Sequence, residues 1–172
     1  MMEAVTACAQ SMVEPKPIAQ QLAPPDGEAL SLAQILARGV SRALAERGLA
    51  TLTEFTLLTG RRVDVIGLDR SGAVTIVEIK TSLEDFRRDQ KWPEYLTFCD
   101  SFYFAVPEGF PLEALPEDCG LMAADPYGAA VLRESAAYAL NGARRRSQNL
   151  RFALVAAERL SRLLDPHHPA GF

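Results

Sequence analysis

The stretch VDVIGLDRSGAVTIVEIK, residues 63–80, has the pattern of two short apolar strands joined by a tight turn. Asp64, Glu78 and Lys80 place two carboxylates and an ammonium in segments that otherwise suit a core. Lone charges are costly to bury, and like charges placed together cost more. The positions of these three charges therefore require either a stabilising partner of opposite charge or a functional role.

The turn between the two strands determines which residues face each other. The pentapeptide DRSGA, residues 69–73, suits a three-residue hairpin loop with glycine at the left-handed position. Asp69 and Ala73 then face each other across the turn. Five residues before Asp69 is Asp64, and five residues after Ala73 is Glu78, so these two carboxylates lie directly opposite each other. Opposed residues share a face, with Cβ atoms roughly 4.5–5.5 Å apart. The strand period of two adds Lys80 to that face.

Two opposed carboxylates destabilise a sheet unless a positive charge lies between them. Lys80 is one candidate for that charge, and a divalent cation is the other. Mg²⁺ takes a few carboxylate oxygens, keeps several waters and leaves room for phosphate oxygens. A lysine beside such an ion can orient an attacking water or stabilise charge on a phosphate. The alternative is an ion-pair cluster at the surface end of a strand.

Composition narrows the class of protein. The 172 residues, 48% hydrophobic and 23% charged, suit one globular domain. The absence of a long apolar run argues against a membrane span, and the N-terminus has no secretory leader pattern. Three cysteines without paired spacing argue against a disulfide framework or a zinc site and favour a reducing cytoplasm. There is no P-loop or dinucleotide-binding motif, and both histidines lie in the tail.

Periodicity predicts one domain over residues 28–164, with a disordered arm over 1–27 and a flexible tail over 165–172. The expected core is a helix, three strands, a helix and a strand, followed by a late hairpin and a C-terminal helix. The last helix has apolar periodicity through Leu150, Leu154, Ala157 and Leu164. The expected elements are a helix over 28–47, strands over 51–58, 62–69 and 73–80, a helix from 82 to about 91, a strand over 101–107, a hairpin over 120–135 and a helix over 144–164.

The net charge of −4 is unevenly distributed. Between Arg133 and Arg162 seven arginines stand against two glutamates, a local charge of +5, which leaves −9 for the rest of the chain. Such a basic segment can face phosphates despite an acidic total, and Arg144, Arg145 and Arg146 are its densest part. The alternative is a solvated helix face.

The chain resembles the PD-(D/E)XK nuclease superfamily in three features: Asp64 on one strand, the tripeptide EIK (residues 78–80) on the next, and the order of its elements. Asp64 matches the first acid of its motif, Glu78 the second and Lys80 the lysine, while Val63 replaces the proline. More narrowly, GRRVDVIGLD, EIKTSLEDFRRDQKWPEY, FCDSFYFAVP and GLMAADPYGAAVLRES resemble the bacterial MmcB-like DNA repair family over roughly residues 30–162. The resemblance implies a restriction-endonuclease-like α/β fold, a mixed sheet flanked by helices, and a role in damage-induced repair or translesion synthesis.

The superfamily resemblance implies further site residues. Another acid is expected near the first helix or strand: Glu54, with Glu46 as the alternative. Glu54 shares the face of Asp64 only if the first hairpin has an odd-numbered loop, such as residues 59–61, or a bulge. Gln90 and Lys91 are candidates on the helix after EIK, and the MmcB-like run favours Lys91.

Two functions follow from these residues. The first is a Mg²⁺- or Mn²⁺-dependent DNA nuclease with metal at Asp64 and Glu78 and with Lys80 beside the phosphate. Arg61 and Arg62, at the tip of the first hairpin, bind phosphates in this interpretation or neutralise nearby acids. The second is a non-catalytic accessory module that recognises a DNA structure or recruits translesion or repair proteins through the same fold.

Overall fold

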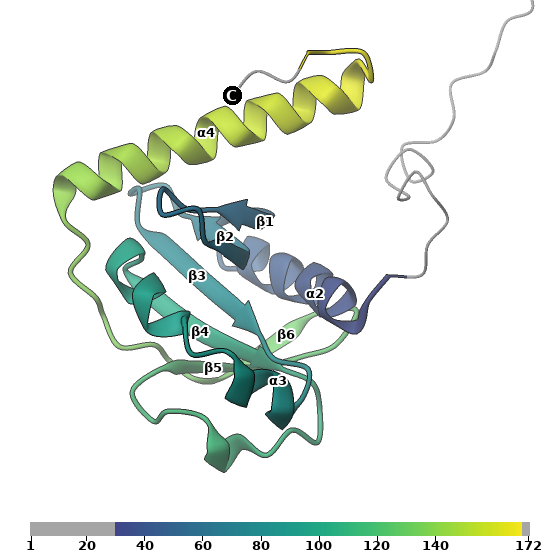
Figure 1. Cartoon of the computed structure of the whole chain (residues 1–172), viewed down its shortest axis with the longest axis vertical. Helices are drawn as coiled ribbons and strands as arrows, with labels where there is room; N and C mark the ends of the chain where they lie inside the picture. The colour runs from purple at the N-terminus through teal and green to yellow at the C-terminus, as the bar shows by residue number, and fades with distance from the viewer. Residues whose placement is uncertain (1–29, 170–172) are drawn as a thin grey trace, which may run out of the picture. The chain divides into compact units, whose positions relative to one another are not determined.

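The computed structural model describes residues 30–169, which form a mixed six-stranded sheet flanked by helices (Figure 1). The strand order across the sheet follows the order along the chain. The first three strands are antiparallel, the third to fifth are parallel, and the sixth is antiparallel to the fifth. The strands are β1 (Ala50–Thr56), β2 (Arg62–Leu68), β3 (Val74–Ile79), β4 (Ser101–Val106), β5 (Gly120–Ala124) and β6 (Ala129–Arg133).

This architecture confirms the expected α/β class, the order of the core elements and the late hairpin β5–β6. The predicted arm over residues 1–27 lies outside the described residues. Within residues 30–169, no helix combines the length and the apolar character needed to cross a bilayer. The helices are α2 (Leu32–Glu46), α3 (Leu83–Arg88), the 3₁₀ segments η1 (Trp92–Phe98) and η2 (Leu112–Ala114), and α4 (Gly142–Leu164).

Helix α2 covers one face of the sheet. It begins at Ser31, whose side chain accepts from the backbone of Gln34 while the Gln34 side chain caps the amide of Ser31 in return. Its apolar spacing buries Val40 and Leu44 against a cluster that includes Val77 of β3. The charged residues Asp64 and Glu78 alternate with this buried set, so they lie on the opposite face of the sheet.

The opposite face is covered by aromatic residues from α3 and η1. Trp92 stacks on Phe102 of β4 at 5.7 Å between ring centroids, and Phe86 meets Phe104 edge-on at 5.5 Å. The Ser82 hydroxyl accepts from the amide of Asp85 and starts α3, as predicted. The helix ends at Arg88, three residues short of the expected end, and the chain continues into η1.

The β2–β3 turn has the predicted form. Asp69 donates its amide to the carbonyl of Ala73 at 3.1 Å, and Gly72 has φ +81°. The Asp69 carboxylate accepts from the amide of Ser71 at 2.8 Å, which further fixes the loop. The observed pairs Val65–Val77 and Leu68–Val74 give the register that this loop requires.

The first hairpin differs from the expected loop by one residue. Leu57 donates its amide to the carbonyl of Arg61 at 2.7 Å, so the three loop residues are 58–60 rather than 59–61. The loop is still odd-numbered, and the register places Glu54 opposite Asp64. Glu54 itself has φ +51°, a left-handed conformation that is rare for a glutamate.

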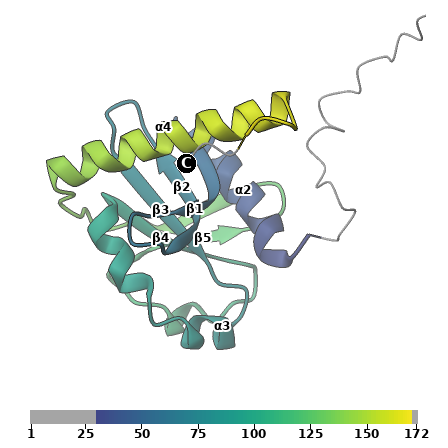
Figure 2. The same ribbon diagram turned by 45° about the horizontal axis from the view of Figure 1, so that its top comes forward.

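Helix α4 runs along the β1 side of the sheet (Figures 1 and 2). Its inward side buries Phe152, which packs against Phe55 of β1 at 6.2 Å between ring centroids, and Gln148. Leu150, Leu154 and Leu164, which carry the apolar periodicity in the sequence, are exposed. The strongest apolar pattern of this segment therefore lies on the outer side of the helix.

Arginines attach α4 to the sheet. Arg145 forms a two-pronged ion pair with Asp100, with both N–O distances 2.6 Å. Arg151 donates to the carbonyl of Thr56 at 2.7 Å, and Arg159 donates to the carbonyl of Thr53 at 2.6 Å. Because β1 is an edge strand, these guanidinium groups satisfy carbonyls that no neighbouring strand reaches.

Replacing Arg145 by alanine should lower the free energy of unfolding by about 1–2 kcal/mol, since it leaves Asp100 without its charged partner. Arg146→Ala is the matched control, because Arg146 is exposed and forms no ion pair with another described residue. Urea denaturation of both variants measures the difference. Equal stability of the two variants would contradict the structural role of Arg145.

Candidate active site

Three charged side chains meet where β3 ends. The register places Asp64 of β2 opposite Glu78 of β3, as predicted, and Lys80 follows on the same face. Glu78 is 6% exposed and Lys80 is 3% exposed. The backbone amide of Lys80 donates to the carbonyl of Ala105 at 2.9 Å, so the chain is still held beside β4 at this point. The three groups are therefore fixed by the sheet rather than by a loop.

Glu78 has one oxygen without a partner. Its Oε1 lies 3.2 Å from Nζ of Lys80, whereas its buried Oε2 accepts no hydrogen bond from any described residue. Burial, and secondarily the negative charge of Asp64, raises the pKa of Glu78 to about 8. The site can therefore take up a proton or a cation at Oε2.

Asp64 is only partly buried. Its Oδ2 accepts from the backbone amide of Ile79 at 2.7 Å, which orients the carboxylate toward the end of β3. Burial raises the pKa of Asp64 despite that hydrogen bond and the nearby charge of Lys80. Both opposed carboxylates therefore favour a neutralising partner.

Lys80 is clamped between two acids. Its Nζ lies 2.6 Å from Oδ2 of Asp89 and 3.2 Å from Oε1 of Glu78. Burial lowers the pKa of Lys80, but the charges and hydrogen bonds of Glu78 and Asp89 outweigh it and leave the pKa raised. The lysine is therefore held as an ammonium.

Asp89 is a site residue that the sequence did not single out. It caps the C-terminal end of α3. Burial raises the pKa of Asp89, but its hydrogen bonds with Lys80 and the amide of Lys91, together with the charge of Lys80, outweigh burial and leave the pKa lowered. The sequence predicted a helix from residue 82 to about residue 91, which would have included Asp89. The helix ends at Arg88, so Asp89 can turn toward Lys80 instead. No local pattern announces that early end.

Tyr95 lies against the same cluster. It comes from η1 and is 4% exposed. Burial, followed by the negative charges of Glu78 and Asp89, raises its pKa to about 12. The phenol therefore stays protonated at neutral pH.

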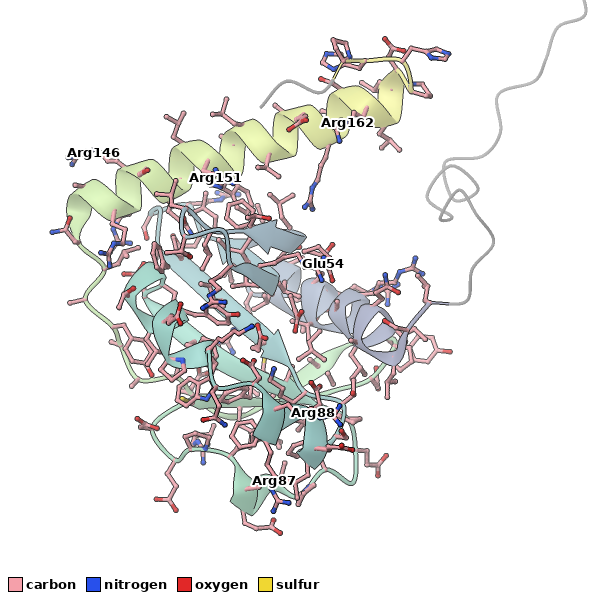
Figure 3. The ribbon with its side chains drawn as sticks, in the orientation of Figure 1. Glu54, Arg87, Arg88, Arg146, Arg151 and Arg162 are labelled. Atoms are coloured by element: carbon pink, nitrogen blue, oxygen red, sulfur yellow. The ribbon has the colours of Figure 1, made fainter. Side chains whose placement is uncertain are left out.

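Glu54 lies near the acid pair, whereas Glu46 ends a helix on the other face of the sheet. The Glu54 carboxylate pairs with Nε of Arg62 at 2.7 Å and adds to the negative charge that acts on Asp64. Figure 3 marks Glu54 on β1. Of the two acids suggested by sequence, Glu54 is the one whose position suits the site.

Neither residue predicted from the α3 segment reaches the acids. The Lys91 side chain is exposed, and its backbone amide donates to Oδ1 of Asp89 at 2.9 Å. Gln90 donates its side-chain amide to the carbonyl of Arg87. Lys91 thus supports Asp89 through its backbone, and a catalytic role for its side chain stays a prediction.

The predicted DNA-binding arginines fall into two groups. Arg61 and Arg62 lie at the site end of the first hairpin, where Arg61 pairs with Glu94 at 3.1 Å and Arg62 pairs with Glu54. Residues 144–146 lie at the far end of β3, where Arg145 also donates to the carbonyl of Gly72 at 3.1 Å. Six strand residues separate the two ends of β3, about 20 Å.

The three predicted arginines of α4 differ in their contacts. Arg145 is engaged with Asp100, and Arg144 donates to the carbonyl of Thr97 and lies 4.9 Å from the centre of the Phe98 ring. Arg146 is exposed (Figure 3). Only Arg146 therefore has a guanidinium that is not already committed within the described chain.

The carboxylates of Asp64 and Glu78 fit a Mg²⁺ ion that keeps most of its water ligands. Over residues 30–169 no group of three or more acid, histidine or cysteine side chains is gathered to enclose a metal. Mg²⁺ does not need such a cage, because it commonly uses one or two carboxylates and keeps its waters. Asp64 and Glu78, with the unpartnered Oε2, supply that donor set.

Comparison with known proteins gives the family of this chain. The family model described as "DNA repair protein MmcB-like" matches residues 20–167. The chain belongs to this family. A solved structure, the SPO1766 protein of unknown function from Silicibacter pomeroyi, is 41% identical, with a TM-score of 0.80 over 84% of this chain and 99% of that one.

A structure of an EndoMS–dsDNA complex matches at 24% identity over 49% of this chain and 39% of that chain. Its TM-score is 0.25. No curated protein matches the chain.

Without metal, the free energy of unfolding should fall as pH rises from about 4.5 to about 8. The folded state keeps a proton on Glu78 up to about pH 8, whereas the unfolded chain loses it near 4.5, so unfolding releases a proton in this window. Glu78→Gln should flatten this slope and add on the order of 2 kcal/mol of stability at pH 8. Denaturation in chelator across this pH range measures the slope.

Glu113→Gln, at an exposed acid of η2, is the control and should leave the slope as it is in the wild type. A Glu78→Gln variant that is less stable than the wild type at pH 8 would show instead that the Glu78–Lys80 pair stabilises the fold.

Proposed function

We propose that this protein is a Mg²⁺- or Mn²⁺-dependent nuclease that hydrolyses DNA phosphodiester bonds during repair. The observation that carries the proposal is the buried, unpartnered Oε2 of Glu78 beside Asp64 and the fixed ammonium of Lys80. A dry, preorganised set of this kind suits stabilisation of a charged transition state. The DNA repair family supplies the substrate class.

In this proposal each side chain has a separate role. Asp64 and Glu78 hold the ion, which would activate a water and neutralise phosphate charge when bound. Lys80 stabilises negative charge on the attacked phosphate, and Asp89 positions it. Glu54 adds a third carboxylate at the outer side of the acid pair. Lys91 is kept as a proposed contributor from the α3 segment.

Arg61 and Arg62 are the proposed phosphate contacts close to the reaction. Their present partners, Glu94 and Glu54, are exposed acids, and exposed ion pairs of this kind exchange readily for a phosphate. Of the arginines at 144–146, the uncommitted Arg146 would contact the DNA backbone about 20 Å away, roughly six base pairs along a duplex, and Arg144 and Arg145 would add positive charge beside it.

A non-catalytic DNA-structure sensor or partner-recruiting module is the second candidate. It is favoured by the contacts of Lys80, whose ammonium is already engaged by Glu78 and Asp89 and so is not turned toward a substrate. In that case the acids serve structure and DNA binding comes from the arginines alone.

Titration of Mn²⁺ and Mg²⁺ into the wild type should show heat of binding, and Asp64→Asn should lose most of it because one of two carboxylate ligands is gone. The same proteins are then incubated with branched, flapped and single-stranded DNA. Cleavage by the wild type that is lost in Asp64→Asn supports the nuclease. Glu113→Gln should behave like the wild type in both assays.

Metal binding without cleavage of any of these substrates would favour a DNA-structure sensor. No metal binding by the wild type would remove the nuclease proposal and leave the accessory module. Because metal binding competes with the proton on Glu78, the affinity should also rise with pH up to about 8.

Replacing Arg61 and Arg62 together by alanine should weaken DNA binding and reduce the salt dependence of the affinity by about one unit of slope per lost phosphate contact. Arg38→Ala, an exposed arginine on α2, is the control because it lies on the other helix layer. Fluorescence anisotropy over a range of salt concentrations measures both. An unchanged slope in the double variant would remove the hairpin tip from the DNA-binding surface.

A further inference from the structure

The outer side of α4 carries an apolar stripe. Leu150, Leu154, Leu160 and Leu164 are 62%, 39%, 56% and 77% exposed. Ala153 and Ala157 lie between them and are also exposed. These six residues form the α4 stripe. At about 100° per residue they fall on one side of the helix.

The α4 stripe lies opposite the side that packs on the sheet. Phe152 and Gln148 are buried, and Arg159 donates a hydrogen bond to β1. These three residues lie about half a turn of the helix away from the stripe. Figures 1 and 2 show no described helix or strand over the outer side of α4. A continuous apolar side of this length on an exposed helix marks an interaction surface.

A groove extends this surface toward the first hairpin. It has a volume of about 310 Å³, and its walls include Leu58, Leu150 and Leu154. Leu58, at the hairpin tip, is itself 53% exposed. The groove is therefore a place where an apolar side chain of a docking partner can be buried.

We infer that the α4 stripe binds the same stripe of a second copy of this chain in an antiparallel helix pair. The stripe is symmetric about Ala157: Leu154 and Leu160 lie three residues to either side of it, and Leu150 and Leu164 lie seven. Antiparallel pairing centred on Ala157 therefore places Leu150 against Leu164 and Leu154 against Leu160, while Ala153 faces the small side chain of Ser161. The small side chain of Ala157 lets the two helices approach closely at the two-fold axis.

Charge distribution along α4 favours the antiparallel direction. The first turn contains no acidic residue and begins the run of arginines at 144–146, which is unfavourable beside the positive end of a helix. An antiparallel second copy brings its carboxyl end, with Asp165, to this end of α4. Arg146, near the start of α4 (Figure 3), then lies near negative charge instead.

Sedimentation equilibrium of the full chain should give twice the monomer mass of 18.8 kDa at micromolar concentration. Leu150→Glu and Leu160→Glu should each shift the protein to monomer, because they place charges inside the pair. Leu132→Glu is the matched control: Leu132 is 51% exposed on β6 and should leave the dimer intact. Circular dichroism melting checks that all three variants remain folded.

A monomeric wild type would overturn the inference, and so would dimers that survive both stripe substitutions. A folded monomer whose stripe is protected from solvent would also overturn it, and would assign the stripe to residues 1–29 of the same chain. Arg146→Glu should weaken association about tenfold, the equivalent of about 1.4 kcal/mol, while Arg38→Glu should not.

Cross-linking tests the direction of the pair. In a Cys8→Ser background, in which the two remaining cysteines are buried, Leu150→Cys and Leu164→Cys are prepared as separate proteins carrying different tags. Mild oxidation of the mixture should join the two tags, because residues 150 and 164 meet across the pair. Each protein alone should stay unlinked, since its two copies of the cysteine are about 21 Å apart. Linkage within each protein alone would indicate a parallel pair and overturn the inference.

Discussion

The opposition of Asp64 and Glu78 across the β2–β3 hairpin is the constraint on which the candidate site depends. A three-residue turn with Gly72 in the left-handed conformation fixes the register, and a slip of one residue would move every side chain to the other face. Two carboxylates held this close need a cation or a proton. Lys80 and Asp89 are the neighbouring charged groups that respond to these two carboxylates.

Lys80 supplies one positive charge beside the two carboxylates and links them to α3. Its ammonium binds Glu78 and also Asp89, which lies at the end of a helix with no fully buried residue. The ion pair therefore helps hold α3 against the sheet, together with the contact of Phe86 on Phe104. Burial, and secondarily the negative charge of Asp64, raises the pKa of Glu78 despite the nearby ammonium of Lys80.

Local chemistry was readable from the sequence, and long-range pairing was not. The turn at residues 70–72 and the start of the helix at residue 82 depend on residues a few positions apart, and the turn alone determines that Asp64 and Glu78 face each other. By contrast, Arg145 meets Asp100 at a separation of 45 residues, and Arg159 meets the carbonyl of Thr53 at a separation of 106. Asp89 was missed because α3 ends early. The arginine count of α4 suggested a phosphate-binding surface, but several of these arginines hold the helix to an edge strand.

The two candidate functions differ in what Lys80 does when a cation binds. Lys80 contacts Oε1 of Glu78, whereas Oε2 of Glu78 has no partner among the described residues. If a divalent ion takes over the neutralisation of Glu78 and Asp64, Lys80 keeps its shorter bond to Asp89 and stays in place. Its ammonium is then free on the side that faced Glu78, next to the ion. No rearrangement of the sheet is required, and a preorganised ammonium of this kind is what phosphate hydrolysis needs.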